Sequence, residues 1–121
     1  MHRPMHCWAL AATVAVLAPA PAFAHAFLDR AIPAVGSEVS SSPPSVTITY
    51  TEAVEPHFST IEVRNAGGVR VDADDVHADD DGKRLVVGLH KLPPGKYTVV
   101  WHVTSVDTHK TEGSFVFTVT P

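Results

Sequence analysis

Sulfur-containing residues are scarce in this chain. Its only cysteine is Cys7, and its two methionines are Met1 and Met5. Beyond position 7 the sequence therefore offers no disulfide and no thiolate or thioether ligand for a soft metal ion. A folded domain formed by the rest of the chain has to be stabilised by its core alone.

Long apolar runs are also lacking. The stretch Trp8–Leu17 is shorter than the roughly 20 residues that a transmembrane helix needs. Arg3 before it and Ala22–Ala24 after it complete the pattern of a cleaved secretory signal peptide, and an uncleaved N-terminal anchor is the alternative. We predict a signal peptide over residues 1–24 and one exported domain over residues 25–121, because that length suffices for one compact core and not for two.

Positive charge is low once the signal peptide is removed. Without Arg3, eight basic residues face thirteen acidic ones, which gives a net charge of −5. This balance argues against nucleic acid and against an anionic membrane surface as partners. Histidine, the commonest metal ligand, is abundant instead. The predicted domain contains six: His25, His57, His77, His90, His102 and His109.

No helical apolar period of useful length occurs, whereas apolar and polar residues alternate in several short segments. The expected strands are 46–50, 61–64, 69–71, 85–89, 97–106 and 115–119. The residues Asn65–Gly68 are typical of a hairpin turn. About seven short strands in about 100 residues predict an all-β, small Greek-key sandwich or barrel. We expect the aromatic side chains of its core to be Tyr50, Phe58, Trp101, Phe115 and Phe117.

The segment Asp72–Asp81 contains six aspartates. A calcium-binding loop would require the EF-hand spacing with a closing glutamate, and neither is present. A solvated acidic loop is the favoured interpretation.

Three residues form a candidate metal site. Cleavage after Ala24 would leave His25 at the N-terminus, so that one residue offers both its α-amine and its imidazole. Asp107 and His109 follow the expected strand 97–106 and, in extended chain, point to the same side. One end of a sandwich can gather strand termini that are distant in sequence. His25 and His109 could therefore meet there.

The chemistry of these ligands favours Cu(II). The amine and Nδ1 of His25 can close a six-membered chelate ring, and His109 and Asp107 would complete a tetragonal nitrogen and oxygen set. The amine has to lose its proton to bind, so the affinity should fall in acid. Asp-x-His pairs are common, and the alternative is that Asp107 and His109 are ordinary polar side chains on a surface loop. For His57, His77 and His90 we favour ordinary surface roles, and His102 should be partly exposed.

The predicted domain resembles the CopC family of periplasmic copper-binding proteins. The similar segments are its start at His25–Leu28, Thr51–Glu55, Leu92–Tyr97, Ser105–His109 and Gly113–Val119. The resemblance implies a cupredoxin-like (Ig-like) β-sandwich with Cu(II) bound by His25, Asp107 and His109. It also implies Glu52 as a neighbour of that site, and a CopD-like inner-membrane protein as a copper-accepting partner. Because the domain has no methionine, it resembles the Cu(II)-only subgroup rather than members with a Met-rich Cu(I) site.

The function predicted on these grounds is not enzymatic. We expect a monomeric periplasmic Cu(II) carrier or buffer for copper resistance or homeostasis. A copper monooxygenase with a histidine brace is an alternative, but Asp107 would occupy a position that oxygen chemistry needs open. A structural or adhesive β-sandwich with incidental histidines is the third interpretation.

Overall fold

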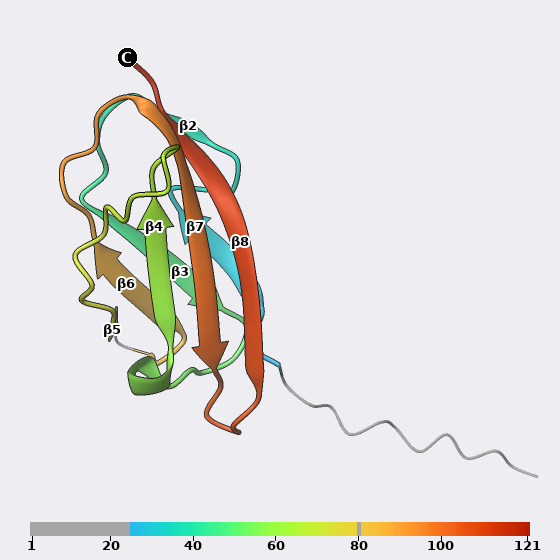
Figure 1. Ribbon diagram of the computed structural model, residues 1–121. Helices are drawn as coiled ribbons and strands as arrows, with labels where there is room; N and C mark the ends of the chain where they lie inside the picture. Colours follow the sequence, from blue (N-terminus) through green and yellow to red (C-terminus); the bar gives the residue numbers. More distant parts are fainter. Residues whose placement is uncertain (1–24, 80) are drawn as a thin grey trace, which may run out of the picture.

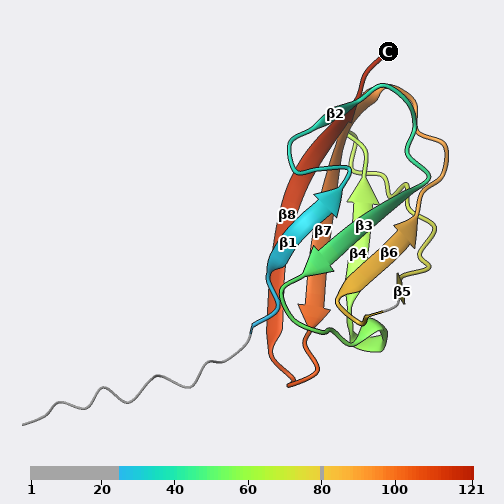
Figure 2. The same ribbon diagram turned by 180° about the vertical axis from the view of Figure 1, so that it is seen from behind.

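A computed structural model describes residues 25–79 and 81–121, and the predicted signal peptide lies outside this part. The described residues form two four-stranded sheets (Figures 1 and 2). One sheet has the order β1 (Leu28–Ile32), β3 (Ser45–Tyr50), β6 (Arg84–Gly88), β5 (His77–Ala78). The other has the order β2 (Glu38–Val39), β8 (Lys110–Val119), β7 (Gly95–Thr104), β4 (Thr60–Arg64). Over the described residues, no helix is long and apolar enough to cross a membrane.

The predicted all-β sandwich is confirmed, and its described part has eight strands rather than about seven because two of the strands have only two residues each. All pairings are antiparallel except that of β2 with β8. The strand expected over 97–106 is β7 and ends two residues earlier, at Thr104, because Ser105 begins a turn. The one short helix within residues 25–79 and 81–121 is a 3-10 turn, η1 (Pro56–Phe58).

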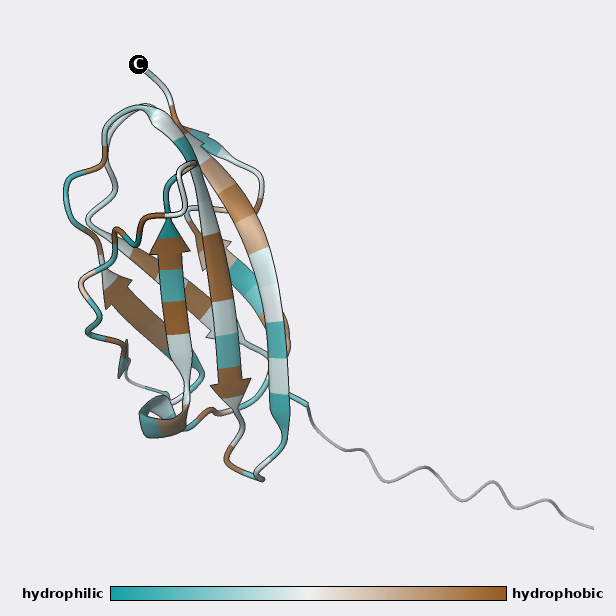
Figure 3. Cartoon of the chain, viewed as in Figure 1, coloured by the Kyte–Doolittle hydropathy of each residue, from teal (hydrophilic) through white to brown (hydrophobic). Residues whose placement is uncertain are grey.

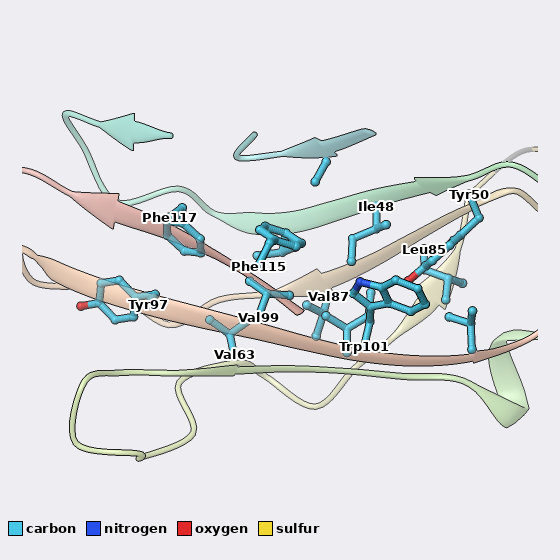
Figure 4. Close-up of a cluster of buried hydrophobic side chains, with 14 of the residues drawn as sticks. Ile48, Tyr50, Val63, Leu85, Val87, Tyr97, Val99, Trp101, Phe115 and Phe117 are labelled. Atoms are coloured by element: carbon cyan, nitrogen blue, oxygen red, sulfur yellow. The ribbon is translucent and has the colours of Figure 1, made fainter. Parts of the chain in front are cut away.

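The core lies between the two sheets and follows from the alternation of residues along the strands. Figure 3 shows brown and teal bands alternating along β4, and buried residues alternate with more exposed ones along β7, as expected for strands with one face buried. Tyr50 and Trp101 meet edge to face with their ring centroids 5.3 Å apart, and Tyr97 stacks on Phe117 at 5.5 Å (Figure 4). Burial raises the pKa of Tyr50, so this phenol stays neutral.

Phe58 is not a core residue, contrary to the prediction. Its side chain is 71% exposed. Pro56 begins η1, in which the Phe58 N–H donates to the Glu55 carbonyl, so the alternation of a strand does not extend back to this position. The buried face of β4 begins only at Ile61.

The predicted turn at Asn65–Gly68 is confirmed. The Asn65 side-chain oxygen accepts hydrogen bonds from the N–H groups of Gly67 and Val69, each at 2.9 Å. The prediction of a strand over 69–71 is wrong, since the chain that returns from the turn makes only an isolated bridge between Arg64 and Arg70.

Among the described residues of the acidic segment, Asp74, Asp75 and Asp81 are exposed, as expected for a solvated loop, but Asp72 is an exception. Its side chain is fully buried and accepts hydrogen bonds from the Val63 and Asp74 N–H groups and from the Arg70 guanidinium at 2.9 Å. Burial opposes its ionisation, but these hydrogen bonds outweigh burial and hold the pKa of Asp72 below its ordinary value. This carboxylate attaches the acidic segment to the edge of β4.

We expect Asp72→Asn to destabilise the fold by about 1–3 kcal/mol at pH 7, because a charge-assisted hydrogen-bond network is lost. The pKa of Asp72 is lowered in the folded state, so its contribution is present above the unfolded pKa and lost as the pH falls through the folded pKa. Urea unfolding at pH 7 and below pH 4 measures this, and the two proteins should converge in acid. Asp74→Asn, at an exposed carboxylate that also pairs with Arg70, is the matched control with little expected effect. Equal losses at both positions would contradict the assignment.

Candidate metal site

The candidate residues 107 and 109 lie in the connection between β7 and β8, at one end of the sandwich (Figure 1). The Thr108 N–H donates to the Ser105 carbonyl at 2.8 Å, and the Ser105 N–H donates to the His109 carbonyl at 2.9 Å. Thr108 adopts a φ of 72°, the left-handed conformation that this tight turn requires. A hydrogen bond from the Val106 N–H to the Ala53 carbonyl fastens the turn to the segment after β3.

Asp107 and His109 contact each other inside this turn. His109 Nδ1 lies 3.2 Å from Asp107 Oδ1, and both side chains are partly exposed. The buried Ser105 hydroxyl donates to the same carboxylate oxygen. The hydrogen bond from Ser105, and then that from His109, holds the pKa of Asp107 below its ordinary value. The carboxylate is therefore ionised at neutral pH, as a metal ligand has to be.

His25 lies beside this turn, three residues before the start of β1. Its imidazole and that of His109 have ring centroids 4.9 Å apart and meet edge to face. The structure thus brings together two residues that are 84 positions apart in sequence, as strand termini at one end of a sandwich can do. Phe27, which is 57% exposed, flanks His25 with a centroid separation of 5.9 Å.

The side chains of this arrangement do not by themselves supply a complete set of metal ligands. Within residues 25–79 and 81–121, no three His, Cys, Asp or Glu side chains are grouped so that they could hold a metal ion. Glu52 is half-buried in the bend that follows β3 and does not enlarge such a group. The α-amine that cleavage after Ala24 would create is a further nitrogen at His25, and a Cu(II) site of the predicted kind depends on it.

The other histidines lie elsewhere on the surface. His102 Nε2 is 2.8 Å from Glu112 Oε2 across β7 and β8, and the His102 side chain is partly exposed, as predicted. His77 Nδ1 contacts the Asp75 carbonyl at 2.8 Å, and His57 and His90 are exposed.

Sequence reasoning missed the residues that hold the site in place. Ser105 organises the turn through its hydroxyl, and the only signal in the sequence is a serine two positions before an aspartate. Thr51 and Thr111 hydrogen-bond to the backbone next to His25, and no sequence pattern distinguishes them from the other strand threonines.

Comparisons with known proteins agree with one another. The family model described as the CopC domain matches residues 28–120. Protein YobA of Escherichia coli (strain K12) is 36% identical over 114 residues, covering 93% of this chain and 92% of YobA. Copper resistance protein C of Xanthomonas campestris pv. juglandis is 36% identical over 112 residues, covering 87% of each chain.

A solved structure shows the same fold. The crystal structure of CopC from Methylosinus trichosporium OB3b superposes with a TM-score of 0.76 at 33% identity, covering 80% of this chain and 95% of that one. The match of the family model over most of the chain, together with these relatives, shows that the chain belongs to the CopC family.

Proposed function

We propose that this protein binds Cu(II) through the α-amine and imidazole of a processed His25 together with Asp107 and His109. The observation that carries this proposal is the 4.9 Å separation of the His25 and His109 rings, with the Asp107 carboxylate in contact with His109. Two imidazoles, an ionised carboxylate and an amine form a nitrogen and oxygen set, which suits Cu(II) in preference to other first-row divalent ions. Relatives such as copper resistance protein C have copper in their names.

The cellular role we propose is that of a periplasmic copper carrier or buffer in copper resistance or homeostasis. The predicted signal peptide would deliver the chain to the periplasm, and its removal would create the amine ligand. Copper binding would therefore begin only after export. A CopD-like membrane protein is the proposed acceptor, and the carrier is proposed to act as a monomer.

A copper monooxygenase is less well supported. Asp107 lies against His109, so its carboxylate would take up a coordination position on a metal held by the two imidazoles, and oxygen chemistry would need such a position open. A carboxylate ligand at that position favours holding the ion over activating oxygen.

The proposal predicts one Cu(II) per processed chain, with an electron paramagnetic resonance spectrum of tetragonal nitrogen and oxygen coordination. Replacement of either residue of the turn, as in Asp107→Ala or His109→Ala, should weaken binding at least about tenfold, since even residues that only support a metal ligand contribute 10–100-fold. Competition titration measures the affinity, and mass spectrometry verifies that the isolated chain begins at His25.

His90→Ala is the matched control, because His90 is an exposed histidine in the connection between β6 and β7. It should leave the affinity and the spectrum unchanged. If His109→Ala bound Cu(II) as tightly as His90→Ala, the proposed ligand set would be wrong.

A further inference from the structure

The three residues that begin the described chain are held by hydrogen bonds to all three of their carbonyl groups. The Thr51 hydroxyl donates to the His25 carbonyl at 3.3 Å and accepts from the Phe27 N–H at 3.0 Å. The Thr51 N–H donates to the Phe27 carbonyl at 2.8 Å. The carbonyl between them, that of Ala26, accepts a hydrogen bond from the Thr111 hydroxyl.

These contacts come from both sheets of the sandwich. Thr51 directly follows β3 in one sheet, whereas Thr111 is the second residue of β8 in the other, two positions after His109. Ala26 is 0% exposed and belongs to the core, so the burial of its methyl group also holds the segment between the two threonines. Hydrogen bonds from both sheets, together with the burial of Ala26, thus fix the segment 25–27 at the end of the sandwich where the β7–β8 turn lies (Figure 2).

We infer that Thr51 and Thr111 are positioning residues which set the register of the N-terminal segment and so place the nitrogens of His25 against His109. This inference rests on the proposed Cu(II) function. The threonines do not touch the metal. They act through the carbonyls of His25 and Ala26, the first two carbonyl groups that follow the chelating amine along the chain.

The physical reason is that a chain terminus which chelates a metal ion tolerates only a small displacement of its backbone. A slip of the backbone by one residue moves the amine by about 3.3–3.6 Å, which exceeds the length of a metal–nitrogen bond. Chain ends are ordinarily mobile unless they are tied down. Ordering the backbone of one residue lowers an affinity by about tenfold, and a segment ordered in advance does not incur this loss when it binds metal.

The test uses Thr51→Val and Thr111→Val in the chain isolated after export and processing, with a mass corresponding to residues 25–121. Valine keeps the shape of threonine and removes the hydroxyl. We expect each variant to bind Cu(II) about tenfold more weakly, the equivalent of ordering about one residue. The electron paramagnetic resonance spectrum should become heterogeneous, which a loss of stability in a still-folded protein would not cause. Thr51→Ser and Thr111→Ser, which restore the hydroxyl, should recover both readouts.

Thr120→Val is the matched control. The Thr120 hydroxyl also donates to a backbone carbonyl, that of Val39 at 3.2 Å, but at the opposite end of β8. Unchanged affinity and spectrum in both Thr51→Val and Thr111→Val would overturn the inference, and so would an equal loss in Thr120→Val. The proposed function fails separately, if wild type and His109→Ala bind Cu(II) alike.

Discussion

A Gly-Ser-Gly-Ser extension ahead of His25 is expected to lower the Cu(II) affinity of the processed chain at least about 100-fold, beyond the 10–100-fold typical of losing a supporting residue. The extension keeps the imidazoles of His25 and His109 and the carboxylate of Asp107. It converts the α-amine of His25 into an amide and thereby removes one ligand and opens the chelate ring. Competition titration at pH 7.5 measures the affinity, and the loss of a nitrogen ligand should be visible in the electron paramagnetic resonance spectrum.

The same extension placed after Pro121 is the matched control. Figure 1 shows the C-terminus at the end of the sandwich opposite the β7–β8 turn, so this addition should have no effect. An N-terminally extended protein that bound Cu(II) like wild type would show that the amine is not a ligand. The precursor would then bind copper before processing, and export would not switch binding on.

The sequence predicted the sandwich because its strands follow a period of two. In β3, β7 and β8 every second residue faces the opposite sheet, and the apolar positions chosen from alternation are buried there. The failure at Phe58 has a different cause. Counting in twos back from Ile61 leads to the buried Ser59 and not to Phe58, and the proline-initiated 3-10 turn leaves the Phe58 side chain exposed.

The candidate site was partly predictable for a different reason. His25, Asp107 and His109 are recognisable by residue type and spacing, and the structure places the two imidazoles side by side. Their support was not predictable. Thr51 and Thr111 act through tertiary hydrogen bonds over 24–85 residues in sequence, and such contacts leave no local periodicity. The burial of Asp72 was unpredictable for the same reason, since it depends on a hydrogen bond to β4 and not on the acidic residues that surround Asp72 in the sequence.

Trp101→Ala is expected to destabilise the domain by about 3–5 kcal/mol, the usual loss for truncating a buried aromatic side chain. The indole is 5% exposed and packs edge to face against Tyr50 in the centre of the core (Figure 4). Small domains are stable by only about 5–15 kcal/mol, so much of the margin would be lost. Urea unfolding followed by circular dichroism measures the change, because Trp101 is the only tryptophan after residue 24 and its fluorescence is lost with it.

Gly113 provides the internal check on this packing. It is the direct cross-strand partner of Trp101, and a Cβ atom there would lie 2.5 Å from the indole Cζ2. Gly113→Ala should therefore cost about 1–3 kcal/mol through overpacking in the wild-type background. In Trp101→Leu the same change should cost much less, because the ring that it would strike is absent, and the coupling between the two positions should be about 0.5–3 kcal/mol. An equal cost of Gly113→Ala in both backgrounds would show that glycine is needed there by the backbone of β8 and not by the indole.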